Sequence, residues 1–167
     1  MLRLLPLTLV LLAAGCAGYR LGPTNGETAG ARSVQVNFFA NQTLEPRLTA
    51  PLNNALRKAI QQDGTYRLDT RGGGDLVVDG TITRFDRSGI SFQPADVITV
   101  RDYALSLTAR VTVKERSTGK VLVDREVIGR TTIRVGADQA STERQAVPLL
   151  AEDLARNTAA LIVDGAW

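Results

Sequence analysis

Histidine is absent from the 167 residues of this chain, and cysteine occurs only once. Without histidine the protein lacks the commonest general base and metal ligand, and Ser-His-Asp and Cys-His catalytic arrangements are excluded. A single cysteine forms no disulfide within the chain, and no thiol–imidazole cluster is present to hold zinc. No paired Asp/Glu motif stands out for acid–base chemistry. We therefore expect a protein that is not an enzyme and that holds no metal and no cofactor.

Aromatic residues are also few, at 5%, and neither sign of charge predominates, with 20 Lys and Arg against 17 Asp and Glu. A nucleic-acid-binding protein needs a concentrated basic face, which this balance does not indicate. Hydrophobic residues make up 44% of the chain, which is typical of a globular protein and not of a disordered one. The composition therefore predicts one folded domain of ordinary size.

The single cysteine closes an apolar stretch at the N-terminus. This stretch follows Arg3, begins at Leu4 and ends in residues 12–16, which read Leu-Ala-Ala-Gly-Cys. A basic tip, an apolar run and small residues at its end are typical of a secretory signal peptide. The run is shorter than the about 20 residues that a membrane-spanning helix needs. We predict a signal peptide over residues 1–15.

The sequence Leu-Ala-Ala-Gly-Cys resembles the lipobox of bacterial lipoproteins, with its leucine one place further upstream than usual. The resemblance implies that Cys16 is the first mature residue and carries a covalent diacylglycerol and an N-acyl chain. Several acyl chains on one residue make a lasting anchor. Ala17 stands where enterobacterial lipoproteins retained in the inner membrane have Asp, which points to the outer membrane with a periplasm-facing anchor. The alternative is a chance cysteine in an ordinary signal peptide.

After the cysteine the composition changes to Gly, Pro, Thr and Asn, which is typical of a flexible linker. We predict that residues 16–31 are the lipidated cysteine and its tether, and that residues 32–167 form a single domain. In this domain residues 34–38 alternate apolar and polar side chains, as a half-buried strand does. A helical stripe follows from Leu48 to Ile60, with Thr43 or Thr49 as its N-cap and Gly64 at its end. Pro51 either suits the first turn, if Thr49 is the cap, or kinks a helix that begins near Glu45.

Three further segments alternate as strands, at residues 75–87, 103–114 and 121–135, and a last helix is expected over about residues 141–164, with Pro148 near its first turn. The predicted order is β-α-β-β-β-α. Alternation with polar residues on one side indicates a sheet that is covered on only one face. The fold class is therefore predicted as α+β, a two-layer sandwich in which two helices cover one face of a mixed four-stranded sheet.

Several short motifs resemble the lipopolysaccharide-assembly lipoproteins of the LptE type, also called rare lipoprotein B. The resemblance rests on residues 18–21 (Gly-Tyr-Arg-Leu), strand 34–39 with the following Asn41–Pro46, residues 75–82 and the turn at Gly119. It implies a non-enzymatic lipoprotein that sits as a plug inside an outer-membrane β-barrel translocon of the LptD type. Such a protein helps the barrel to assemble and to deliver lipopolysaccharide to the outer leaflet.

A lipoprotein activator of a periplasmic peptidoglycan synthase is the alternative. Such activators are also anchored in the outer membrane and are also small α/β domains, but their tethers are long. Here the segment between Cys16 and the first strand spans at most ~50 Å when fully extended. This short reach favours work at the membrane itself.

Five arginines are candidates for binding lipopolysaccharide: Arg84, Arg87, Arg101, Arg130 and Arg134. In a meander the end of one strand lies beside the start of the next, so all five are expected at one end of the sheet. Arginine forks suit phosphates, which lipid A carries. Arg84 shares the phase of the core residue Ile82, unless a bulge intervenes. In the alternative reading these arginines are solvated and pair with Asp86, Asp96 and Asp102.

Residues 88–101 are too apolar for an idle surface loop. The candidate partner contacts in this segment are Ile90, Phe92, Val97 and Ile98. The segment either continues the flanking strands as a long hairpin or forms a loop that contacts a partner, and its side chains either meet the barrel or pack on the protein's own sheet.

Overall fold

The structure is a computed structural model that describes residues 28–93, 96–134 and 139–164. The signal peptide, Cys16 and most of the predicted tether lie outside the described residues. The elements are β1 (Ser33–Val36), β2 (Ala40–Asn41), η2 (Pro46–Leu48), α2 (Thr49–Asp63), β3 (Arg67–Asp69), β4 (Leu76–Gln93), β5 (Asp96–Glu115), β6 (Val121–Arg134) and α3 (Gln139–Val163).

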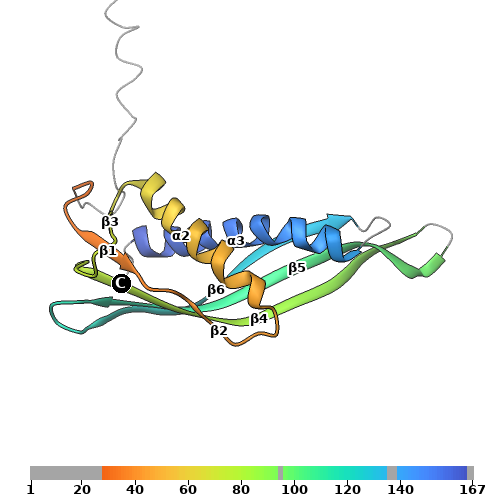
Figure 1. The fold of residues 1–167 in the computed structure, drawn as a ribbon, viewed down its shortest axis with the longest axis horizontal. Coiled ribbons are helices and arrows are strands. Elements are labelled where there is room, and N and C mark those ends of the chain that lie inside the picture. The colour runs from red at the N-terminus through yellow and green to blue at the C-terminus, as the bar shows by residue number, and fades with distance from the viewer. Residues whose placement is uncertain (1–27, 94–95, 135–138, 165–167) are drawn as a thin grey trace, which may run out of the picture.

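One mixed sheet carries both helices on the same face (Figure 1). Its strand order is β3-β1-β4-β5-β6, and β2 pairs with β4 beyond the end of β1. β1 runs parallel to β3 and β4, because α2 carries the chain back along the sheet, whereas β4, β5 and β6 form an antiparallel meander. The predicted α+β sandwich with two helices on one face is confirmed. β2 is a short strand beyond the four of the predicted sheet. β3 lies within one residue of a short strand that the sequence indicates over residues 66–68, outside those four.

The two longest strands form one hairpin that reaches beyond the helices (Figure 1). Residues 88–93 and 96–101 continue β4 and β5, so the hairpin alternative for this segment is the one observed. The predicted strands end too early because the ladder is irregular between Ile82 and Arg84 and again between Gly89 and Gln93. Each irregularity shifts the phase of the apolar residues and hides the continuing strand from a period-2 pattern.

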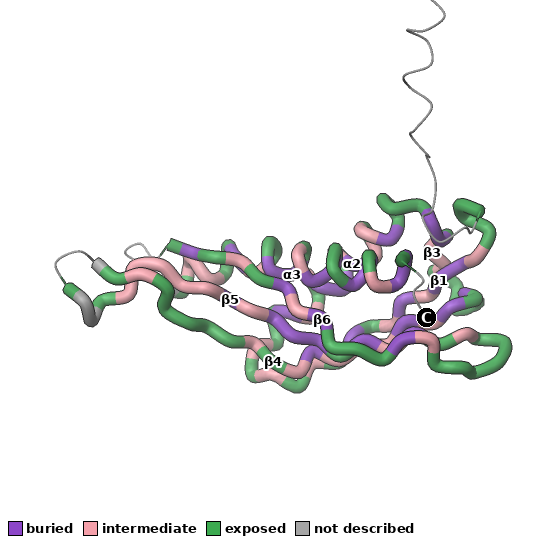
Figure 2. The backbone as a smooth tube through the Cα atoms, turned by 180° about the vertical axis from the view of Figure 1, so that it is seen from behind, coloured by how far each residue is buried: buried purple, intermediate pink, exposed green. Residues whose placement is uncertain are grey.

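The core lies between the helices and the sheet, where Figure 2 shows the buried backbone. Its largest fully buried side chains include Leu52, Leu56 and Ile60 of α2, Leu150, Leu154 and Ile162 of α3, and Leu105 and Leu107 of β5. A side-chain atom on Gly129 of β6 would lie 2.5 Å from the backbone nitrogen of Leu154. α3 and β6 therefore approach more closely than any larger residue at position 129 permits.

The helix ends differ from the prediction in two places. α2 begins at Thr49 after the single turn η2, and no side chain caps it, so the proposed caps at Thr43 and Thr49 are wrong. The Thr43 hydroxyl instead bonds within its own turn, to Asn41. α3 begins at Gln139, so Pro148 lies inside the helix and not near its first turn. Pro51 lies in the first turn of α2, which is one of its two predicted places, although Thr49 is the first residue of the helix and not its cap.

Candidate functional site

A single bulge decides which face of the sheet the arginines occupy. Ile82 pairs with Ala109, whereas Arg84 pairs with the adjacent Thr108, so Thr83 is an extra residue in β4. Before the bulge Ile82 points to the core; after it Phe85 pairs with the buried Leu107 and takes the core side. Side chains alternate along a strand, so Arg84 lies on the opposite, open face. The sequence left the face of Arg84 undecided, and the bulge resolves it.

Three of the five predicted arginines share this open face of the distal sheet, which we define as residues 83–93, 96–108 and 128–134. In β6, Arg130 pairs with Ser106 and Arg134 pairs with Asp102, both of which alternate with the buried Leu105. Arg84, Arg130 and Arg134 are all exposed. The distal sheet therefore presents a basic open face at the end where the hairpin extends past the helices.

Arg87 lies on the other side of the sheet, so the five arginines meet at one end but not on one face. It pairs with Leu105, forms an ion pair with Glu143 of α3 and lies 5.7 Å from the centre of the Tyr103 ring. Arg101 forms an ion pair of 3.9 Å with Asp102. Arg84, Arg87 and Arg101 lie inside their strands, because β4 and β5 are longer than the periodicity predicts. In β6, Arg134 is the last residue and Arg130 lies four residues before it.

Asp102 and Asp86, two of the predicted acidic partners, pair with arginines. Asp102 accepts a hydrogen bond from the Ser91 hydroxyl and one of 3.0 Å from Nε of Arg134. The bond from Ser91 has the largest effect in lowering the pKa of the Asp102 carboxyl, and the bond from Arg134 lowers it further. Asp86 lies 4.0 Å from Nε of Arg84, with both side chains more than half exposed. Such a pair is loose and contributes little to stability. Asp96 accepts a hydrogen bond from Thr99.

The candidate partner contacts occupy the outer part of the hairpin. Ile90 is 53% exposed and Phe92 is 49% exposed, so about half of each side chain is not packed on the protein's own sheet. Val97 and Ile98 lie in β5, and their side chains are outside the described part of the structure. The exposed halves of these two side chains are available to a partner, and the contact itself stays a prediction.

The turn that the sequence predicts over residues 41–46 lies beside the bulge. Oδ1 of Asn41 accepts hydrogen bonds from the backbone N–H and the hydroxyl of Thr43, and Nδ2 of Asn41 donates to the carbonyl of Glu45. These bonds hold Leu44 at the apex, where its side chain is 98% exposed. The turn belongs to the motif that carries the family resemblance, but periodicity does not say which way Leu44 points.

Between this turn and β4 lies a groove of about 550 Å³. It is lined by the turn residues 42–45, by residues 83–87 of β4 and by Glu143 of α3. Both Arg84 and Arg87 reach it, from opposite faces of the sheet. The groove thus combines two guanidinium groups with an exposed leucine at the outer edge of β4.

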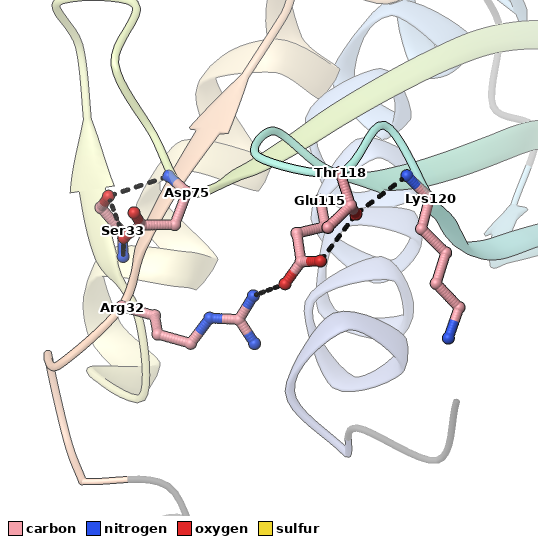
Figure 3. A network of polar contacts seen from close by, with 6 residues as sticks. All are labelled: Arg32, Ser33, Asp75, Glu115, Thr118 and Lys120. Carbon is pink, nitrogen blue, oxygen red and sulfur yellow. Dashed lines mark hydrogen bonds and ion pairs between the residues drawn. The ribbon is translucent and has the colours of Figure 1, made fainter.

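The opposite end of the sheet is where the chain enters the domain, and a polar network fixes it there (Figure 3). Nη2 of Arg32 lies 3.1 Å from Oε1 of Glu115, and the other carboxylate oxygen of Glu115 accepts a hydrogen bond from the Thr118 hydroxyl. Ser33 bonds to Asp75. Arg32 and Ser33, which follow the predicted tether, are thereby joined to the start of β4 and to the β5–β6 turn.

No group of three or more potential metal ligands occurs among the residues that the structure describes. Over the same ranges, neither helix has the length and hydropathy that a transmembrane span requires. At the surface of the distal sheet, the exposed arginines are able to contact an anion, and Ile90 and Phe92 are able to contact apolar groups.

Comparison with protein families finds a match to the LptE family, described as lipopolysaccharide-assembly, over residues 31–164. No significant match is found among curated proteins.

Among solved structures, the protein XCC0632 from Xanthomonas campestris is similar with a TM-score of 0.63 at 10% identity, over 87% of this chain and 91% of that one. The hypothetical protein CT253 from Chlamydia trachomatis has a TM-score of 0.58 at 11% identity, over 79% and 96% of the two chains. A minor lipoprotein from Acinetobacter baumannii has a TM-score of 0.54 at 13% identity, over 79% and 92%. At these identities the likeness concerns the fold.

Proposed function

The chain belongs to the LptE family of lipopolysaccharide-assembly proteins, and from this membership we propose that it is the outer-membrane lipoprotein partner of a β-barrel translocon of the LptD type. In this role the domain sits in the barrel as a plug, helps the barrel to assemble and assists the passage of lipopolysaccharide to the outer leaflet. Cys16 holds the protein at the membrane through its lipid, with the domain on the periplasmic side.

The observation that carries a lipopolysaccharide-binding role is the basic open face of the distal sheet. Arg84 lies there on β4, and Arg130 and Arg134 lie on β6, on the far side of β5. All three are exposed; Arg84 is loosely paired with Asp86, and Arg134 pairs with Asp102 at 3.0 Å. Among the described residues no ion pair occupies the side chain of Arg130. Guanidinium groups form strong forked hydrogen bonds with phosphates, such as those of lipid A. Arg87 and Arg101 belong to the same end of the sheet and add to its positive potential.

Co-purification tests the partner. The mature lipoprotein, extracted from membranes in detergent with an affinity tag at its C-terminus, is expected to bring down a barrel of the LptD type in a fixed ratio. The synthase-activator alternative instead predicts a peptidoglycan synthase in that fraction and no barrel. The short tether supports the first outcome, because it keeps the domain within ~50 Å of the lipid.

A further inference from the structure

In the distal sheet the two edge strands are β4 and β6, and they differ in how far their outward backbone groups are hydrogen-bonded. At β6 the backbone N–H of Arg130 donates to Oδ2 of Asp153 at 2.9 Å, and the carbonyl of Ile128 accepts from Nδ2 of Asn157 at 2.8 Å. Both acceptor and donor come from α3. Side chains of the protein's own helix therefore occupy backbone groups at residues 128–130 of this edge, and a further strand cannot pair along these residues without displacing them.

At β4 the outer edge is covered for only part of its length. β1 and β2 pair with β4 as far as Ile82, and in the described ranges no strand pairs with the outer side of residues 84–92. Ile82 turns its carbonyl outward, where it accepts a hydrogen bond of 2.9 Å from the N–H of Gln42. Alternation across the bulge then directs the backbone groups of Phe85, Arg87 and Gly89 outward.

This open edge has the properties of a docking strand. Its pairing with β5 is regular from Arg84 to Gly89, so the outward groups repeat at the spacing that another strand needs. Ile90 and Phe92, two residues apart, expose about half of their side chains. No proline occurs in residues 84–92, so every residue of this edge has a backbone N–H. A strand added beside residues 84–92 would follow β1 and β2 along the same side of β4.

We propose that the outer edge of β4, residues 84–92, is completed by an extended segment of the barrel partner that adds to the sheet as a further strand. The inference rests on the proposed function and specifies how the partner binds. Strand addition of this kind takes its affinity from backbone hydrogen bonds and its specificity from alternate side chains.

The chemistry of the surroundings identifies the occupant. Strands of a closed barrel are paired on both sides, so the added segment comes from a part of the partner outside its barrel wall. The groove beside the edge contains Leu44 and the loosely paired Arg84, which fit a segment that carries apolar and acidic side chains. A second copy of this chain fits less well, because symmetric pairing about residue 87 or 88 places the two Arg87 side chains opposite or beside each other.

Hydrogen–deuterium exchange of the mature lipoprotein, alone in detergent and in the purified complex with the barrel, tests the proposal. Added strand hydrogen bonds are expected to slow exchange of the outward amides of Phe85, Arg87 and Gly89 by about tenfold or more in the complex. Amides of β6 at residues 127–131 are expected to be unchanged, since α3 already caps that edge. A stable complex in which the β4 amides exchange as in the free protein would overturn the inference and leave the proposed function standing. Failure to form any complex overturns both, and protection that depends on lipoprotein concentration alone would identify a second copy as the occupant.

A matched pair of variants separates the edge from general surface effects. Ile90→Lys places a charge on the open edge, whereas Val121→Lys places one at the start of β6, where the native side chain is 49% exposed, much as at Ile90. Ile90→Lys is expected to reduce recovery of the barrel at least about fivefold, and Val121→Lys to leave it unchanged. Thermal unfolding of both variants verifies that each is folded. Equal recovery with both folded variants argues against the proposed edge.

Discussion

The carboxylate of Asp75 accepts two hydrogen bonds from Ser33, one from the backbone N–H and one from the hydroxyl, each 2.7 Å long. The N–H of Asp75 donates to the same hydroxyl at 3.0 Å. Three bonds thus join the first residue of β1 to the residue before β4 (Figure 3). The bonds from Ser33, the backbone bond foremost, lower the pKa of the Asp75 carboxyl. These bonds lie directly after the predicted tether, which ends at residue 31, and they fix the start of β1 to the sheet.

The Asp75→Asn variant is expected to lose stability at neutral pH and to show a weaker dependence of stability on acid. A carboxyl whose pKa is lowered by folding stabilises the folded state fully above its ordinary pKa, near pH 4, and loses that contribution as the pH falls through the lowered value. Urea unfolding at a series of pH values between about 2 and 7 measures this. Glu152→Gln, on an exposed position of α3, is the control. Parallel pH profiles for wild type and Asp75→Asn would contradict the assignment.

Replacing Gly129 by alanine is expected to destabilise the domain by about 1–3 kcal/mol, because the new methyl group meets the backbone of Leu154 and α3 must move away from β6. Gly73→Ala is the matched control: its added atom meets only Oδ2 of Asp69, at 3.7 Å, and a change within about 0.5 kcal/mol is expected. Denaturant unfolding of both variants decides. Equal stabilities would mean that α3 and β6 are not in the close contact described.

Reversing the charges of Arg84, Arg130 and Arg134 to Glu is expected to weaken lipopolysaccharide binding by the soluble chain that starts after Cys16, by about tenfold or more, and added salt is expected to weaken the wild type. The matched control reverses Lys58, Lys120 and Arg125, which are exposed elsewhere on the domain. Arg57 is unsuitable for this control because it stacks on Phe38 at 4.7 Å and bonds to the carbonyl of Val36. Equal losses in both triple variants would indicate diffuse attraction and no site on the open face.

Cys16→Ser is expected to release the protein from membranes or to leave its signal peptide uncut, since a serine hydroxyl does not receive the lipid that the lipobox resemblance implies. Cell fractionation and the mass of the mature protein measure the two outcomes. The prediction fails if the variant stays in the membrane fraction and its mature mass matches that of the wild type apart from the substituted atom.

Local pattern was enough for the parts of the fold that repeat regularly. The apolar stripe from Leu52 to Ile60 predicts α2, and the alternation from Tyr103 to Lys114 predicts the inner half of β5, because burial on one face imposes a period on the sequence. The predicted signal peptide and lipid site at Cys16 are likewise read from contiguous residues. They lie outside the described part of the chain and stay predictions.

Tertiary structure decided which face each arginine occupies and which edge of the sheet is open, because both depend on residues that are distant in sequence. The sequence places five arginines at one end of the sheet, but the extra residue at Thr83 is what sends Arg84 to the open face, while Glu143 of α3 holds Arg87 on the other. The same holds for the edges of the sheet. Nothing in β4 or β6 alone says which edge is open; that follows from where β2 ends and from where α3 places Asp153 and Asn157. A one-residue shift in register exchanges the two faces of a strand, and a local period cannot detect a shift that only the partner strand defines.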